Sequence, residues 1–384
     1  MRFEFATATR IVFGPGAGGE VAPAAKALGR RALVVTGRSR ERSAAIVAEL
    51  EAAGVSCAYF SVPEEPTIEL VCEGQRLARA EQCDLVIGFG GGSALDAAKA
   101  IAALLTNRRD VMDYLEVIGA GQTLNAPGAP FIAIPTTAGT GTEVTRNAVL
   151  GSPEHRVKAS LRSPLMLARL AVVDPELTYD LPPAITARTG LDALTQLIEP
   201  YVCNRANPLT DGYCREGMAR VARSLRRAYH EDRNIEARTD MSLASLLGGL
   251  SLANAGLGVV HGFAAPVGGM FPAPHGAVCA ALLPHGMAVN VRALRTRAAG
   301  SEKLRRYETV ARILTGKPDA TVEDGVEWVS ELCRELAIPP LRAYGIQPDD
   351  IPTLAEKASQ TSSMKANPIV LTADELREVL TRAL

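Results

Sequence analysis

Residues 83–106 read CDLVIGFGGGSALDAAKAIAALLT, and the fold class follows most directly from this segment. The apolar run at 85–88 is typical of a buried strand, and the alanine-rich part that begins at Ala94 is typical of a helix. Between them lie the small residues Gly90, Gly91, Gly92 and Ser93. Glycines let a backbone approach a phosphate, and a helix N-terminus supplies N–H groups and a favourable dipole. The segment predicts a phosphate-binding turn, with a flexible glycine-rich loop as the alternative.

Strand-like and helix-like segments alternate before this unit. They are RRALVVTG (30–37), SRERSAAIVAELEAAG (39–54), VSCAYFSV (55–62) and PTIELVCEGQRLARAEQ (66–82). This alternation is typical of a parallel sheet with right-handed crossovers, whose ligand lies at the carboxyl ends of the strands. The sequence therefore predicts an α/β, Rossmann-like domain over residues 1–181. The patterns beyond it are mostly helical, so residues 182–384 are predicted to form an all-α domain.

The chain opens with strand-like residues 3–13, which are followed by Gly14, Gly16 and Gly19. These glycines fit the GxGxxG spacing of a dinucleotide-binding turn. No acidic residue stands about 20 positions later at the end of the next strand, where a ribose contact would require one. We interpret the three glycines as a turn that starts a helix.

A polar loop follows the predicted strand at 131–134. Its sequence, PTTAGTGTEVT (135–145), offers hydroxyl groups on a backbone kept open by glycines, those of Thr136, Thr137, Thr140 and Thr142. Hydroxyls and bare backbone suit a ribose, a pyrophosphate or a carboxamide. Asn147 and Lys158 come next, and we expect both to face a cofactor. The alternative for Lys158 is a solvated surface charge.

Residues 241–290 contain no Asp, Glu, Lys or Arg, but they contain three of the five histidines, His261, His275 and His285. So apolar a run must be buried, and buried imidazoles need partners. Its glycines and prolines divide it into two or three helical pieces with the histidines near the junctions. Each histidine could simply be a hydrogen-bonded core residue.

Asp192 lies in a second apolar helical pattern and shares a helix face with Gln196, four residues later. A buried carboxylate needs a cation. We therefore expect a site for one divalent metal, with a position left open for substrate. Its expected ligands are Asp192, Gln196, His261 and His275.

Composition limits the classes of function. The 384 residues include 41 Lys and Arg and 42 Asp and Glu, which gives a net charge of -1. This balance lacks the excess positive charge that is typical of nucleic-acid-binding proteins. The seven cysteines include no CxxC pair, which is typical of a reducing compartment. The N-terminus has no apolar export segment, and residues 241–290 are too rich in glycine, proline and histidine to span a membrane. We expect a cytoplasmic protein that acts on small molecules.

Several motifs together resemble the iron-containing alcohol dehydrogenase family. In chain order they are FGGGSALDAAKA (89–100), PTTAGTGTEVT (135–145), TGLDALTQLIEPYV (189–202), ANPLTD (206–211), VVHGF (259–263), PHG (274–276) and LLPHG (282–286). The resemblance implies a dehydroquinate synthase-like architecture, in which a metal and a nicotinamide lie in the cleft between an α/β and an all-α domain.

The resemblance also implies roles for individual residues. Contact with the cofactor falls on Gly90, Gly91, Gly92, Ser93, Asp96, Thr136, Thr137, Thr140, Asn147 and Lys158. Metal binding falls on Asp192, His261 and His275. We expect His261, His275 and Gln196 to be the catalytic residues, although Gln196 itself departs from the family pattern.

Three positions depart from the family pattern. Gln196 replaces a histidine ligand, and because a carboxamide binds iron or zinc more weakly than an imidazole does, we expect a lower affinity for Fe²⁺ or Zn²⁺. Ala265 replaces a histidine that would relay protons. Gly37 and Arg38 stand where many members have an aspartate for the ribose, so a 2′-phosphate is tolerated and NADP is favoured over NAD.

The predicted reaction is hydride transfer between NADP or NAD and the carbonyl carbon of an aldehyde or ketone. The alternatives are a maleylacetate-type oxo-acid reductase, a lyase of the dehydroquinate synthase type, and a nucleotide-binding protein without catalysis. The uncharged run at 241–290 disfavours the first two, because it offers no cation for a carboxylate or a phosphorylated substrate. The opening strand could pair with a second copy at a sheet edge, which predicts a homodimer.

Overall fold

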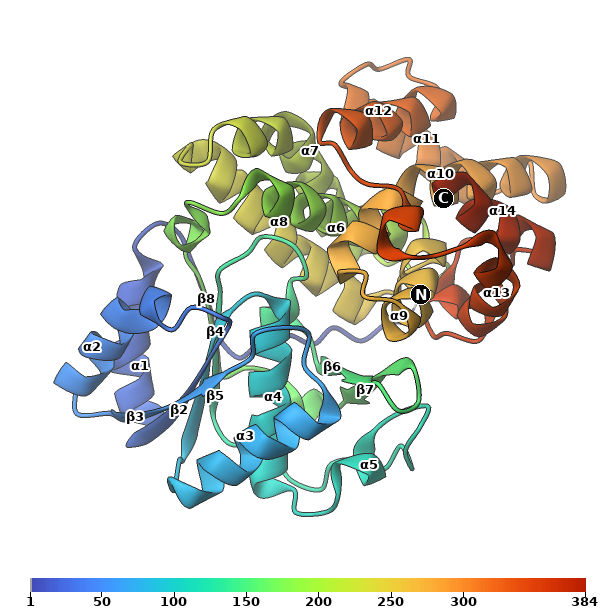
Figure 1. Cartoon of the computed structure of the whole chain (residues 1–384). Coiled ribbons are helices and arrows are strands. Elements are labelled where there is room, and N and C mark those ends of the chain that lie inside the picture. The colour runs from blue at the N-terminus through green and yellow to red at the C-terminus, as the bar shows by residue number, and fades with distance from the viewer. Residues whose placement is uncertain (1) are drawn as a thin grey trace. The chain divides into compact units, whose positions relative to one another are not determined.

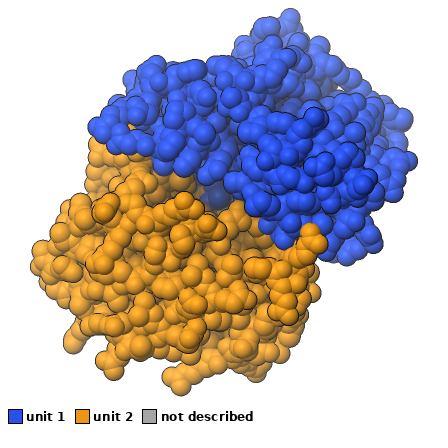
Figure 2. Space-filling model, in the orientation of Figure 1, with its two compact units in different colours: residues 1–4, 138–140, 180–384 blue, residues 5–137, 141–179 orange. Residues whose placement is uncertain are grey.

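The structure is a computed structural model that describes residues 2–384. The chain forms two compact units, which Figure 2 shows in different colours. Unit 2 consists of Phe5–Thr137 and Gly141–Tyr179. Unit 1 consists mainly of Asp180–Leu384 and also takes in Ala138–Thr140. All β-strands of the described residues lie in unit 2, whereas unit 1 is helical.

Unit 2 is built on a six-stranded parallel sheet with the strand order β1-β8-β5-β4-β2-β3. The strands are β1 (Ile11–Phe13), β2 (Arg31–Thr36), β3 (Ser56–Ser61), β4 (Leu85–Gly90), β5 (Phe131–Pro135) and β8 (Leu170–Val173). The central strands are apolar throughout because both faces of the sheet are covered, as the sequence predicts for a parallel sheet. The α/β class predicted for this part of the chain is confirmed.

Two pairs of helices cover the sheet (Figure 1). One face carries α1 (Val21–Leu28) and α2 (Ala44–Ala52), and the other carries α3 (Ile68–Ala80) and α4 (Gly92–Thr106). The remaining elements of unit 2 are the short helix α5 (Val111–Tyr114) and an antiparallel hairpin of β6 (Asn147–Ser152) and β7 (Val157–Arg162). The sequence analysis did not foresee this hairpin.

The opening of the chain differs from its prediction. Only Ile11–Phe13 of the expected strand 3–13 is in a strand, and it pairs with β8 at the edge of the sheet. The glycines that follow do form a turn before a helix, because Gly16 has a φ of 74° and precedes a short 3-10 turn that leads into α1. That left-handed conformation is one that glycine adopts without strain.

Unit 1 consists of nine helices within the described residues. They are α6 (Pro183–Val202), α7 (Pro208–His230), α8 (Ile235–Asn254), α9 (Val259–Met270), α10 (His275–Arg297), α11 (Glu302–Thr315), α12 (Val322–Glu335), α13 (Ile351–Ser359) and α14 (Ala373–Ala383). The apolar run at 241–290 is divided into three helices, as predicted, but Pro266 and Pro284 lie inside α9 and α10 and do not end them. His261 and His275 lie near helix starts as predicted, whereas His285 lies inside α10 and not at a junction.

The helix α10 is long and apolar enough to be a candidate membrane span by length and composition. However, 83% of its apolar window is buried inside the structure. Its partners include α6, α9 and α14, so its apolar residues serve the core of unit 1.

Close packing of α10 on α6 depends on Gly276. A Cβ atom at this position would lie 2.7 Å from the backbone oxygen of Arg188 in α6, which cannot move away as a flexible side chain would. We expect Gly276→Ala to lower the free energy of unfolding by about 1–3 kcal/mol, measured by urea denaturation. The control is Gly212→Ala in α7, where a Cβ meets nothing within 4 Å. It should raise stability by up to about 1 kcal/mol, and equal effects of the two variants would contradict this account.

Candidate functional site

The glycine turn that is predicted to bind phosphate lies where the carboxyl ends of β2, β4 and β5 meet. Gly90 ends β4, and α4 begins at Gly92 without a side-chain cap on its N-terminus. A Cβ on Gly90 would be 3.4 Å from the backbone nitrogen of Gly37, and one on Gly91 would be 3.3 Å from Oγ1 of Thr137. The structure therefore brings the triple glycine, the end of β2 and the first threonines of the polar loop together.

Asp96 orders the threonine loop. One carboxylate oxygen accepts a short hydrogen bond from Oγ1 of Thr142, and the other accepts one from the backbone nitrogen of Val149 at 3.0 Å. Asp96 thus connects both the threonine loop and β6 to α4 through hydrogen bonds. Its contact with a cofactor stays a prediction.

Lys99 lies one turn further along α4 and was missed by the sequence analysis. It is 1% exposed, and its ammonium group donates to the backbone oxygens of Thr142 and Asn147 at 2.7 and 2.8 Å. It also donates to Oγ1 of Thr142 and Thr145. Burial lowers the pKa of Lys99 to about 8, although the charges of Asp96 and Glu143 oppose this shift. A lysine in an alanine-rich helix gives no sign of such burial from sequence alone.

Asn147 and Lys158 lie at different places in the hairpin. Asn147 is opposite Arg162 in the β6–β7 register, whereas Lys158 is opposite Gly151. The side chain of Lys158 is 7% exposed and forms a close ion pair with Glu65. It is therefore not a solvated surface charge.

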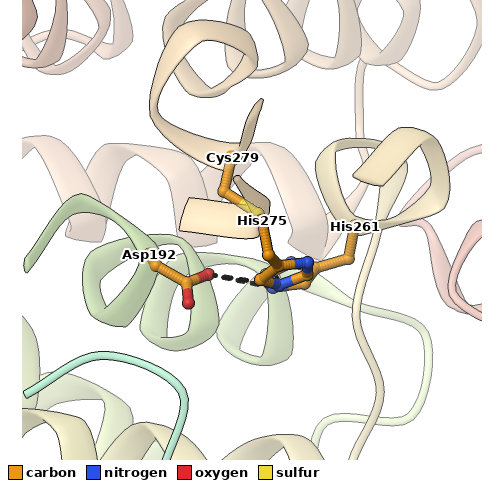
Figure 3. Close-up of side chains that lie close together, drawn as sticks. All are labelled: Asp192, His261, His275 and Cys279. Atoms are coloured by element: carbon orange, nitrogen blue, oxygen red, sulfur yellow. Dashed lines mark hydrogen bonds and ion pairs between the residues drawn. The ribbon is translucent and has the colours of Figure 1, made fainter. Parts of the chain in front are cut away.

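A cluster of potential metal ligands lies in unit 1 (Figure 3). Asp192 comes from the middle of α6, His261 from the start of α9, and His275 and Cys279 from the first turns of α10. One donor atom from each of the four lies within 4.8 Å of all the others. Nε2 of His261 is 3.4 Å and Nε2 of His275 is 3.6 Å from Oδ1 of Asp192.

Three buried atoms in and beside this cluster have no hydrogen-bond partner among the described residues. They are Oδ1 of Asp192, Oε1 of Gln196 and Nε2 of His261. A buried polar atom without a partner costs about 1–3 kcal/mol. Burial alone would raise the pKa of Asp192, but the neighbouring His275 and His261 outweigh it and lower that pKa. All three atoms are electron-pair donors, so the donor set fits a cation.

Glu199 orients His261. Its Oε2 lies 2.7 Å from Nδ1 of His261, and its Oε1 accepts a hydrogen bond from the backbone nitrogen of Val260, also at 2.7 Å. A proton held at Nδ1 by this carboxylate leaves the lone pair of Nε2 for a metal. The sequence analysis missed Glu199, although it lies seven residues after Asp192 and hence on the same face of α6.

Gln196 is also held in one orientation. Its Nε2 donates to the backbone oxygen of Gly139 at 3.2 Å, so its unpartnered atom is the carbonyl oxygen Oε1. Cys279, four residues after His275, was not among the predicted ligands. His285, further along α10, is not part of the cluster, and burial lowers its pKa.

Comparisons with known proteins identify the class to which this fold and cluster belong. The family model "Iron-containing alcohol dehydrogenase" matches residues 8–175, and "Fe-containing alcohol dehydrogenase family, C-terminal" matches residues 186–384. The chain belongs to the iron-containing alcohol dehydrogenase family and is an oxidoreductase that acts on alcohols or aldehydes.

Individual relatives align over almost the full length. The chain is 35% identical to 1,3-propanediol dehydrogenase of Klebsiella pneumoniae, covering 95% of each, and 35% identical to lactaldehyde reductase of Escherichia coli, covering 96% of each. A crystal structure of 1,3-propanediol oxidoreductase superposes with a TM-score of 0.93 at 32% identity, covering 100% of both chains. Sulfoacetaldehyde reductase of Bifidobacterium kashiwanohense in complex with NAD⁺ gives a TM-score of 0.86 at 28% identity, covering 100% of this chain and 99% of that one.

We expect Glu199→Ala to weaken zinc binding about 10–100-fold, because Nδ1 of His261 loses the carboxylate that fixes its proton. Competition with a chromophoric chelator measures this affinity. Glu199→Gln, which retains a hydrogen-bond acceptor, should lose less. Glu236→Ala, an exposed glutamate in α8, is the control. Unchanged affinity in Glu199→Ala would show that the carboxylate does not support the metal site.

Glu143 provides a pH-dependent test of the loop. Its carboxyl group is 2% exposed, and burial raises its pKa from 4.5 to about 7. The folded state therefore keeps a proton that the unfolded chain releases between these values, so this contribution to stability is lost as the pH rises. Relative to Glu143→Gln, the wild type should lose up to about 3 kcal/mol of unfolding free energy between pH 5 and 7.5. A difference that stays constant with pH would contradict the burial of a neutral carboxyl.

Proposed function

We propose that this protein transfers a hydride between C4 of NADPH or NADH and the carbonyl carbon of a small aldehyde or ketone, and the reverse with the alcohol. The observation that carries the proposal is the set of buried, unpartnered donor atoms on Asp192, Gln196 and His261, next to His275. Relatives named for propanediol and lactaldehyde support a small oxygenated substrate.

Asp192, His261 and His275 would hold a divalent metal, Fe²⁺ or Zn²⁺, with Gln196 as a weaker oxygen donor. A metal bound there supplies a Lewis acid that polarises the carbonyl oxygen and stabilises the alkoxide. Glu199 supports this role of the site, because it holds a proton at Nδ1 of His261 and so leaves Nε2 of that residue for the metal.

The cofactor would lie on the edge formed by β2, β4 and β5 in unit 2. Backbone N–H groups at Gly91, Gly92 and Ser93 suit the pyrophosphate, because α4 begins there with no side-chain cap. The further contacts that we propose are Gly90, Asp96, Thr136, Thr137, Thr140, Asn147 and Lys158. We also propose residues 1–181 as the cofactor domain and 182–384 as the domain for metal and substrate, and the two compact units support this division.

We propose a preference for NADPH. Gly37 directly follows β2 and lies beside the triple glycine, and Arg38 comes next with a side chain that is 74% exposed. Arg38 now contacts the backbone oxygen of Pro63 and the exposed Glu64, from which it could turn to a 2′-phosphate. A bidentate charge-assisted contact of this kind favours phosphate over a hydroxyl group.

Replacing Arg38 tests this preference. Arg38→Ala should raise the Kd of NADPH about 10–100-fold, the loss of one charge-assisted contact, and leave the Kd of NADH unchanged. Fluorescence titration of each cofactor gives both values. Arg76→Ala, an exposed arginine in α3, is the control. Equal effects on the two cofactors would contradict a role in binding the 2′-phosphate.

The reaction itself is tested by mixing the metal-loaded protein with NADPH or NADH and a panel of small aldehydes, ketones and oxo-acids. Loss of reduced-nicotinamide absorbance with an aldehyde, and its recovery with the matching alcohol, is the expected result. Consumption with oxo-acids alone would replace the proposal with a maleylacetate-type reductase. A cofactor that binds but is never consumed would overturn an oxidoreductase function.

We propose that the protein is a cytoplasmic homodimer. Among the described residues, the edge strand β1 pairs only with β8, which leaves its other side for a second copy. All seven cysteines are free thiols, as in proteins of a reducing compartment. Light scattering after size-exclusion chromatography should give twice the chain mass of 40.5 kDa, and a monomer would contradict the dimer.

A further inference from the structure

We propose that Sγ of Cys279 is a ligand of the same metal, so that the binding set of this chain is Asp192, His261, His275 and Cys279, a set that favours zinc over iron and to which the substrate oxygen would add as a fifth ligand. This inference rests on the proposed function, because it extends the metal site on which that function depends. No motif in the sequence analysis assigned any role to Cys279.

The spacing of the donor atoms carries this inference. His275 and Cys279 are four residues apart on α10 and so project from the same helix face, and Sγ lies 3.7 Å from Nε2 of His275. Around a tetrahedral ion, two nitrogen or oxygen ligands are about 3.3 Å apart, and a sulfur and a nitrogen ligand are about 3.5 Å apart. The observed separations of 3.4, 3.6 and 3.7 Å are close to these edges. These are three of the six edges, and the other three separations are within 4.8 Å, so the four donor atoms are close enough together to surround one ion.

Burial supplies a second, independent argument. Cys279 is 0% exposed, and Asp192 and His261 next to it are 1% and 7% exposed. Oδ1 of Asp192 and Nε2 of His261 are buried with no hydrogen-bond partner among the described residues, and the Asp192 carboxylate needs a positive charge beside it. A cation meets that need, and the thiol releases its proton to solvent as the sulfur–metal bond forms.

A thiolate ligand at Cys279 would also compensate for Gln196, which stands where the family pattern has a histidine ligand. A carboxamide is a weak ligand for zinc or iron, whereas a thiolate is a strong one for zinc. The side-chain nitrogen of Gln196 is fixed on the backbone oxygen of Gly139, so its free oxygen can accept a hydrogen bond from a substrate hydroxyl instead of serving as the fourth ligand. Soft sulfur in the set shifts the preference from iron towards zinc and cobalt.

The test is titration of the metal-free full chain with Co²⁺, followed by absorption spectroscopy. A sulfur ligand produces an intense thiolate-to-cobalt charge-transfer band in the near ultraviolet. We expect this band in the wild type, together with release of a proton, and we expect Zn²⁺ to compete with Co²⁺ more strongly than Fe²⁺ does. Cys279→Ser should lose the band and bind Co²⁺ at least about 10-fold more weakly.

The matched control is Cys214→Ser in α7, a second cysteine that is 0% exposed and lies outside the cluster. It undergoes the same change of atom at an equally buried position, so it should keep the band and the affinity. Thermal unfolding of both variants separates loss of the fold from loss of the ligand. The wild-type spectrum tests the inference even if Cys279→Ser does not fold.

Two results would overturn the inference, and they differ in their meaning. Tight Co²⁺ binding without the charge-transfer band, unchanged in Cys279→Ser, would remove Cys279 from the ligand set and leave the proposed metal-dependent reaction standing. Failure of the wild type to bind Co²⁺, Zn²⁺ or Fe²⁺ would overturn both the ligand assignment and the metal-dependent mechanism.

Discussion

Burial of electron-pair donors without hydrogen-bond partners is the constraint on which unit 1 depends. Oδ1 of Asp192 and Nε2 of His261 face each other across 3.4 Å inside an apolar helical core. A buried carboxylate needs a positive charge beside it, and the packing of α6, α9 and α10 places two imidazoles there. Gly276 allows α10 to approach α6 closely, and the carboxylate of Glu199 fixes the orientation of His261. The core is arranged to present lone pairs to a cation.

Unit 2 has a different physical requirement, since the ligand proposed for it is an anion. The glycines at the end of β4 keep side chains away from the backbone, and the uncapped start of α4 leaves N–H groups for a phosphate. Lys99 orders the neighbouring threonine loop, because its ammonium group donates hydrogen bonds to backbone oxygens and threonine hydroxyls of that loop. The glycine turn therefore exposes its backbone N–H groups, and the buried ammonium group of Lys99 keeps the adjacent threonine loop well ordered.

The spacing of apolar residues and the positions of glycines and prolines predicted the structural classes of both units. They also predicted the helices, strands and turns that carry the site. They failed where tertiary contacts decide the outcome. The opening segment has strand-like residues, but only its last three pair with β8. Pro266 and Pro284 are tolerated within buried helices. The hairpin that contains Asn147 and Lys158 gave no clear alternation before its partner strand was known.

The cluster shows the same limit at the level of single residues. Asp192, His261 and His275 stand out in sequence because polar residues are rare in apolar helices. Glu199 could have been found in the same way, because it shares a face of α6 with Asp192. Lys99 and Cys279 do not stand out, because their significance lies in partners from other segments or from another turn of the helix. A cysteine in an apolar helix is read as a small core residue, and only the 3.7 Å approach to His275 reveals another role.

The most direct test of the central claim is a crystal structure of the zinc-soaked protein, with diffraction data collected on both sides of the zinc absorption edge. The account predicts one anomalous peak per chain, surrounded by Asp192, His261 and His275 and absent below the edge. A chain without a peak among these residues, or with zinc only at other positions, would contradict it.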